Sequence, residues 1–216
     1  MHSAVRLTAR NLLASGVLTN AQLIDASLSA HFQQQRCDPV RDRATHVITA
    51  AHFAKDIQQA RVANATFDGV ADSFECIPGT DIAVGRLRTP APACQLLPIA
   101  GSTVKPGQKL VSLGFSDQYR VAPSGLVPRY VSSLVVTGLP WIVTYDFKTR
   151  ARHGALLLPT GLQWSRRGDS GGPVLRDGQL AGIQSMVSVP MGLPLGFAAI
   201  NLLGPHLPAI RSAMNQ

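Results

Sequence analysis

The hexapeptide Gly168-Asp169-Ser170-Gly171-Gly172-Pro173 places one serine among three glycines. A serine hydroxyl is a weak nucleophile until a nearby base removes its proton and fixed N–H donors receive the negative charge that forms on the attacked carbonyl. Because glycine allows a tight backbone bend, the N–H groups of Gly168 and Ser170 can converge on one oxyanion. The hexapeptide therefore predicts a nucleophilic serine whose base lies elsewhere in the chain.

The same residues also fit G-x-S-x-G, the nucleophile elbow of α/β-hydrolases. An elbow requires a helix directly after the serine. Here Pro173 follows, and the next residues, 174–176 and 180–183 around an Asp177-Gly178 turn, predict a β-hairpin. The hairpin disfavours the elbow.

Composition limits the function classes. The chain has 216 residues, enough for one large or two small β domains, and a formal net charge of +8. Its basic residues are scattered, and Arg166-Arg167 is the longest basic run, so we predict no nucleic-acid partner. No apolar stretch approaches the ~18 residues of a membrane span. There is no clear signal peptide, and the compartment and the oligomeric state stay open.

The cysteines and histidines do not predict a metal site. Cys37, Cys76 and Cys94 form no C-x-x-C pattern, and no histidine and carboxylate cluster has metal spacing. His46 is interpreted as a strand residue. We expect neither a metal nor a cofactor, and Cys76 and Cys94 could form the single disulfide that three cysteines allow.

The chain divides into four segments. Residues 1–30 carry arginines but few acidic residues, and we interpret them as an N-terminal arm, a pro-segment or a targeting segment. Short apolar runs between turns predict an all-β fold, either two antiparallel barrels or a sandwich, with one half in residues 31–100 and the other in residues 101–200. A terminal helix is expected in residues 201–216.

Two residues beside predicted strands are candidates for the base and its partner. His52 follows the apolar run Ile48-Thr49-Ala50-Ala51, and Asp81 directly precedes the apolar run Ile82-Ala83-Val84. A carboxylate at the start of a buried strand needs hydrogen-bond donors, and an imidazole N–H is a suitable one.

The motifs T-A-A-H at His52, D-I-A-V at Asp81 and G-D-S-G-G-P at Ser170, in this order, resemble those of chymotrypsin-like (trypsin-fold) serine peptidases. The resemblance implies two antiparallel six-stranded barrels with the active site between them. It also implies an endopeptidase in which His52 activates Ser170 and Asp81 orients His52, acting on protein or peptide substrates through an acyl-enzyme. A trypsin-fold binding or scaffolding protein that no longer cuts is the alternative.

The resemblance extends to substrate-binding residues. Ser185 matches a serine that steadies the buried aspartate, and Ser185, Met186 and Val187 match the strand that pairs with the substrate backbone. Trp164 aligns with the base of the specificity pocket, Val187 narrows its entrance, and Gly196 remains small. With Ser165 and Arg167 nearby, these residues favour a small, polar or acidic residue before the scissile bond.

The chain also departs from the animal members of the family. It lacks the cut hydrophobic N-terminus whose ammonium group binds the aspartate before the nucleophile, so we expect Arg166 or Arg167 to neutralise Asp169, as in bacterial-type members. The family disulfide beside the catalytic histidine is absent, because Phe53 follows His52.

Overall fold

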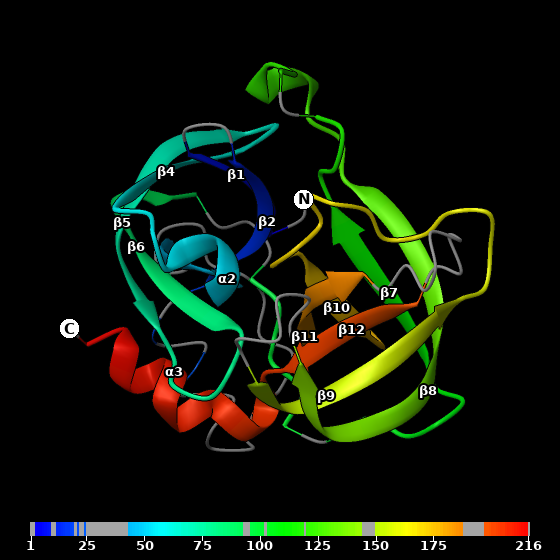
Figure 1. Cartoon of the computed structure of the whole chain (residues 1–216). Helices are drawn as coiled ribbons and strands as arrows, with labels where there is room; N and C mark the ends of the chain where they lie inside the picture. The colour runs from blue at the N-terminus through cyan, green and yellow to red at the C-terminus, as the bar shows by residue number, and fades with distance from the viewer. Residues whose placement is uncertain are drawn as a thin grey trace.

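The computed structural model describes residues 3–9, 12–19, 21, 24, 43–92, 96–101, 103–118, 120–143, 150–187 and 197–215. Its strands form two closed antiparallel barrels of six strands each, which lie side by side (Figure 1). The all-β, two-barrel prediction is therefore confirmed. Among the described residues, no helix has the length and apolar character needed to cross a membrane.

The first barrel closes in the order β1-β2-β3-β6-β5-β4. Its strands are β1 (Ala4–Ala9), β2 (Leu12–Thr19), β3 (Ala44–Ala50), β4 (Gln59–Asn64), β5 (Phe67–Cys76) and β6 (Ile82–Ala91). Inward side chains such as Leu7, Val47 and Val62 are fully buried and fill the barrel. The short helix α2 (Ala51–Ala54) follows β3 directly.

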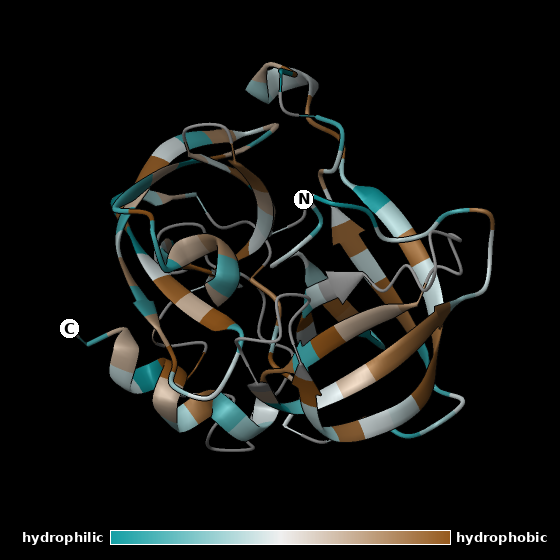
Figure 2. Ribbon diagram, viewed as in Figure 1, coloured by the Kyte–Doolittle hydropathy of each residue, from teal (hydrophilic) through white to brown (hydrophobic). Residues whose placement is uncertain are grey.

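The second barrel closes in the order β10-β11-β12-β9-β8-β7. Its strands are β7 (Lys109–Gly114), β8 (Arg129–Val143), β9 (Arg150–Pro159), β10 (Pro173–Arg176), β11 (Gln179–Val187) and β12 (Ala198–Leu202), and a 3-10 turn, η1 (Pro123–Gly125), lies between β7 and β8. Figure 2 shows apolar and polar residues alternating along the strands, as expected when one face packs inward and the other meets solvent. The β10–β11 hairpin is the one that the sequence predicts after Ser170.

An apolar cluster separate from the interior of the first barrel joins the two barrels. It contains Ile48 and Ile82 from the first barrel, Ile183 from the second, and Leu207 and Ile210 from the C-terminal segment. That segment comprises the 3-10 turn η3 (Gly204–His206) and helix α3 (Leu207–Ala213). The predicted helix is thus shorter than residues 201–216, because β12 continues to Leu202.

The interpretation of residues 1–30 as a segment outside the barrels was wrong for the part that the structure describes. Strands β1 and β2 belong to the first barrel, where β1 pairs with both β2 and β4. Arg6, whose charge suggested an arm or targeting segment, is buried and donates to the carbonyls of Gln118 and Val121 at 2.5 and 2.7 Å. The sequence did not reveal this role, because the partners of Arg6 lie more than a hundred residues away.

Candidate active site

His52 and Asp81 are brought together by the pairing of β3 with β6. The register aligns Ala50 with Ile82, so the residues that follow β3 lie beside the residue that precedes β6. The Nδ1 atom of His52 lies 2.9 Å from Oδ2 and 3.1 Å from Oδ1 of Asp81, and the backbone N–H of His52 donates to Oδ1 at 2.9 Å. The predicted contact between these two residues is thus present.

The second barrel completes the surroundings of Asp81, which is fully buried. The Ser185 hydroxyl donates to Oδ2 of Asp81. The backbone N–H of Asp81 donates to Oδ1 of Asn201 at 2.7 Å. The carboxylate therefore accepts bonds from both barrels, and Ser185 has the contact that the sequence resemblance implied.

Asn201 was missed by the sequence analysis. It is fully buried in β12, and its amide nitrogen donates to the carbonyls of Arg152 and His153 at 2.7 and 3.2 Å. An amide between the apolar residues Ile200 and Leu202 is a signal in itself, because a buried amide is costly unless it is hydrogen-bonded. The signal does not reveal the partner.

The loop around Ser170 is a tight turn. Gly168 and Gly171 have φ of +101° and +81°, and the N–H of Gly172 donates to the Asp169 carbonyl at 2.9 Å. Within the described part of the chain, the N–H groups of Gly168 and Ser170 donate to no protein acceptor. Both donors are therefore available to an oxygen atom of a ligand.

The loop lies against the end of the strand that precedes His52. A Cβ atom added to Gly171 would clash with the Thr49 hydroxyl and lie 2.7 Å from the Ala50 nitrogen. Among the described contacts there is no hydrogen bond between the side chains of His52 and Ser170, and such bonds are often long without a bound substrate. The contact of Gly171 with Thr49 and Ala50 thus brings together the chain beside Ser170, from the second barrel, and the chain beside His52, from the first.

Asp169 is neutralised by an arginine that the sequence analysis did not select. The carboxylate is buried and accepts from the backbone N–H groups of Ser116 and Arg166 at 3.0 and 2.8 Å. The Nη1 atom of Arg129 lies 3.4 Å from Oδ2. The expectation of an Arg166 or Arg167 ion pair was wrong: the Arg166 guanidinium pairs with Asp117 at 2.7 Å.

Arg167 is exposed. Trp164 is 37% exposed, and its indole lies under the Arg166 guanidinium, 5.6 Å from ring centre to Cζ. Ser165 is buried, and its hydroxyl has no hydrogen-bond partner in the part of the chain that the structure describes.

The other predicted substrate-binding residues are placed only in part. Met186 and Val187 belong to β11, where they pair with Ala199 and Ala198, but their side chains lie outside the described residues. Gly196 lies outside them altogether. The predicted pocket entrance therefore stays a prediction.

Of the three cysteines, the structure describes Cys76. Cys76 is a free thiol whose pKa is raised by burial and by nearby carboxylates, Asp81 first among them. Cys37 and Cys94 are not among the described residues. No group of three or more histidine, cysteine or acidic side chains that could hold a metal occurs in the described ranges.

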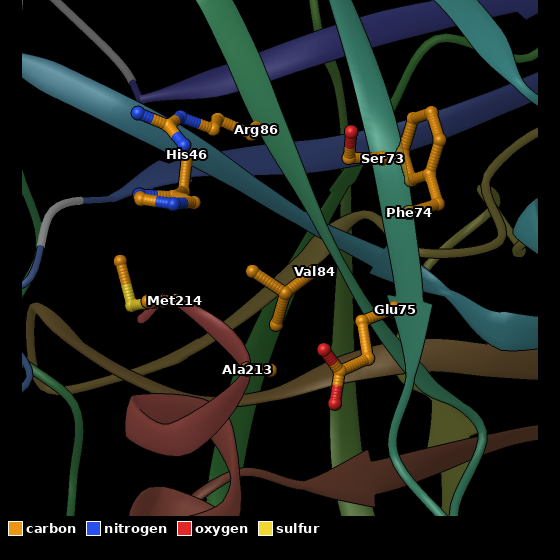
Figure 3. Close-up of a pocket in the computed structure, with 8 residues that line it drawn as sticks. All are labelled: His46, Ser73, Phe74, Glu75, Val84, Arg86, Ala213 and Met214. Atoms are coloured by element: carbon orange, nitrogen blue, oxygen red, sulfur yellow. The ribbon is translucent and has the colours of Figure 1, made fainter. Parts of the chain in front are cut away.

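A cavity of about 360 Å³ lies away from this site, between β5, β6 and the end of α3 (Figure 3). His46, Glu75, Arg86 and Met214 are among its lining residues. His46 belongs to β3, as predicted, and its pKa is lowered by burial and by Arg86 and Arg211. None of His52, Asp81 and Ser170 lines the cavity.

Two closed barrels, with a histidine–aspartate pair from one and a G-D-S-G-G loop from the other, define the class of trypsin-fold serine peptidases. A family model described as Trypsin matches residues 13–199, and the chain belongs to this family. No curated protein matches the sequence significantly.

Several solved structures share the fold. A mutant, inactive form of Rv3671c from M. tuberculosis H37Rv has a TM-score of 0.67 and 16% identity, over 99% of this chain and 88% of its own. The MamO protease domain from Magnetospirillum magneticum has a TM-score of 0.64 and 20% identity, covering 96% and 95%. Kallikrein-related peptidase 10 has a TM-score of 0.68 and 18% identity, covering 99% and 95%.

Proposed function

We propose that this protein is a serine endopeptidase that hydrolyses peptide bonds through an acyl-enzyme. The observation that carries the proposal is the buried Asp81 carboxylate bonded to Nδ1 of His52 beside the loop around Ser170. The Gly168 and Ser170 N–H groups of this loop have no acceptor among the described residues. A purely binding protein has no physical need of either feature. The family assignment supports the same reaction class.

In the acylation step, Ser170 Oγ attacks the carbonyl carbon of the scissile bond while Nε2 of His52 takes the hydroxyl proton. The N–H groups of Gly168 and Ser170 donate to the oxyanion that forms. When the C–N bond breaks, His52 returns the proton to the leaving amine. Asp81 holds Nδ1–H, so that Nε2 is the basic nitrogen, and stabilises the imidazolium ion that forms during each proton transfer.

In the deacylation step, water attacks the ester carbon and gives its proton to His52, and the proton then returns to Ser170 Oγ. The products are a carboxylic acid, an amine and the regenerated serine. No other reactant is needed for the balance of atoms and charge.

The ion pair of Asp169 with Arg129 supports activity without prior cleavage of the chain. In this arrangement the buried charge of Asp169 is balanced from within the second barrel. The uncut chain, shown by N-terminal sequencing to retain Met1, should therefore hydrolyse substrate. Complete inactivity of that form, with activity after a cut, would contradict this part of the proposal.

For the residue before the scissile bond, we keep the prediction of a small, polar or acidic side chain. Ser165 has no hydrogen-bond partner among the described residues, but it is buried and lends this prediction no direct support. Trp164, which is more than a third exposed and stacked under Arg166, lends no support to a pocket closed by a buried indole.

The test is cleavage of a diverse peptide library, read by mass spectrometry, with Ser170→Ala in parallel. Cleavage by the wild type alone is the expected result, together with covalent labelling of Ser170 by a fluorophosphonate probe. Folded wild-type protein that neither cuts nor reacts with the probe would favour the binding or scaffolding alternative.

A further inference from the structure

Ser15, in the first barrel, takes part in four hydrogen bonds, two of which are with the loop around Ser170. Its hydroxyl donates to the Gly168 carbonyl at 2.9 Å and accepts from the Phe115 N–H at 3.0 Å. Its backbone N–H donates to the Ser170 carbonyl at 2.8 Å. Its carbonyl accepts from the Thr49 hydroxyl at 2.7 Å. Ser15 is fully buried, so water does not compete for these bonds.

We infer that Ser15 is a positioning residue that fixes the oxyanion donors and sets Ser170 in place relative to His52. The inference rests on the proposed function. In this role Ser15 contacts neither the substrate carbonyl nor the proton that passes from Ser170 to His52. It acts through the backbone of the loop around Ser170.

The first argument concerns the peptide groups that Ser15 holds. The proposed donors are the N–H groups of Gly168 and Ser170, and Ser15 binds the carbonyls of these same two residues. The Gly168 N–H belongs to the peptide group before this residue, and the carbonyl that Ser15 binds belongs to the peptide group after it. Gly168 has φ of +101°, and because glycine rotates freely, the residue alone does not fix the angle between these two groups. Among the described residues, Ser15 is the one side chain that binds the Gly168 carbonyl.

The second argument concerns the barrels. Ser15 belongs to β2, which lies between the rest of the first barrel and strands β7 and β10 of the second (Figure 1). Thr49 belongs to β3 and lies three residues before His52. The chain of contacts Thr49–Ser15–Ser170 therefore connects the strand that carries the base to the loop that carries the nucleophile.

The third argument concerns how the loop is held elsewhere. The Asp169 side chain is bound by Ser116, Arg129 and the backbone of Arg166, which all belong to the second barrel. These contacts fix the loop within its own barrel, but they do not relate it to His52. Ser15 supplies that relation.

The test compares wild type, Ser15→Ala and the control Ser112→Ala. Ser112 is also a buried strand serine, but its hydroxyl has no partner among the described residues, so this control removes a hydroxyl without removing any described hydrogen bond. Steady-state kinetics use a peptide taken from the library cleavage sites. For Ser15→Ala we expect kcat to fall about 10- to 100-fold with little change in KM, less than the loss on removing an oxyanion donor itself.

A second measurement separates positioning from general loosening of the fold. Ser170 Oγ adds to the carbonyl carbon of a peptide aldehyde, and the serine proton passes to His52. The aldehyde oxygen becomes an oxyanion that the Gly168 and Ser170 N–H groups bind. The corresponding peptide alcohol binds without reacting. Ser15→Ala should weaken the aldehyde about tenfold or more while changing the alcohol less than about twofold, because the alcohol places no charge on the donors.

The outcomes are distinct. Equal loss of aldehyde and alcohol affinity, or wild-type kinetics in Ser15→Ala, would overturn the inference while leaving the proposed function intact. If the wild type neither cuts nor reacts with a fluorophosphonate, the proposed function fails and the inference fails with it.

If Ser15→Ala does not fold, Thr49→Val tests the same chain of contacts, because it removes only the bond to the Ser15 carbonyl. We expect a loss of aldehyde over alcohol preference in the same direction. An unchanged preference in folded Thr49→Val would overturn the inference.

Discussion

Arg129 and Asp169 form an ion pair across forty positions of the chain, with 3.4 Å between Nη1 and Oδ2. Arg129 also donates to the hydroxyl of Ser116, whose backbone N–H binds the other carboxylate oxygen. The carboxylate next to Ser170 is thus held by one charge and two backbone donors. This arrangement has consequences for stability and for activity.

Replacing Arg129 by methionine should destabilise the protein by about 3 kcal/mol, because it leaves a buried carboxylate without its counter-charge. Loss of fluorophosphonate labelling at Ser170 should accompany it, since Asp169 lies within the loop. Chemical denaturation and labelling rates measure both effects. The control Arg61→Met breaks an exposed pair with Asp68 and should cost at most about 1 kcal/mol. Equal stability of the two variants would contradict the role of Arg129.

Two glycines with similar φ allow the cost of backbone strain to be distinguished from the cost of a steric clash. Gly171 and Gly178 have φ of +81° and +78°. An added Cβ at Gly178 meets nothing within 4 Å, whereas at Gly171 it meets the carbonyl of Ser15 and the hydroxyl of Thr49. Gly178→Ala should cost about 1–2 kcal/mol from φ alone. Gly171→Ala should cost clearly more and abolish peptide cleavage, and similar melting temperatures for both variants would show that the contact can relax.

Asp81→Asn should lower kcat by about four orders of magnitude with the fold preserved, because an amide can bind the histidine in the wrong tautomer. Ser185→Ala leaves the three contacts of His52 with the Asp81 carboxylate and removes one bond to Oδ2. Its loss of kcat should be far smaller, about tenfold, in line with one lost hydrogen bond to a charged group. Steady-state assays with a peptide taken from the library cleavage sites give kcat for both variants. Equal losses of kcat would argue against Asp81 as the residue that orients His52.

His46 should make the protein less stable on mild acidification. Burial, with Arg86 and Arg211, lowers the pKa of His46, so the unfolded chain takes up a proton at this residue more readily than the folded one. Its contribution is complete above about pH 6.5, the ordinary value for histidine, and is lost as the pH falls below it. Asp68, whose pKa is lowered by Arg61, acts in a more acidic range.

Denaturation at pH 7.5 and pH 5.0 should therefore give a smaller difference in unfolding free energy for His46→Gln than for the wild type. His206, whose pKa is also lowered by burial, remains in both proteins and leaves part of the slope. An unchanged slope in the variant would contradict the assignment to His46.

The two-barrel fold and the meeting of His52 with Asp81 could be predicted because the signals are local. Each residue adjoins an apolar run, and the runs become neighbouring strands β3 and β6. The loop around Ser170 is likewise encoded in six consecutive residues. The roles of these residues in catalysis stay predictions until the variants above are measured.

Ser15, Arg129 and Asn201 could not be predicted in the same way. Ser15 and Gly168 are separated by 153 positions, and Asn201 and Asp81 by 120. A buried hydroxyl or amide in an apolar strand indicates that a partner exists, but tertiary packing decides which one. The same reason explains the error over β1, where the arginines suggested an arm or targeting segment but Arg6 is buried and binds the carbonyls of Gln118 and Val121.

Two glycines beside the loop around Ser170 have no space for a larger side chain. A methyl group at Gly114 would overlap the Asp169 carboxylate, and one at Gly172 would overlap the Leu113 carbonyl. Single substitutions at these positions are therefore closed as routes to a new substrate preference. A change of substrate preference is therefore expected at positions other than these two glycines, with the packing of the loop around Ser170 kept as it is.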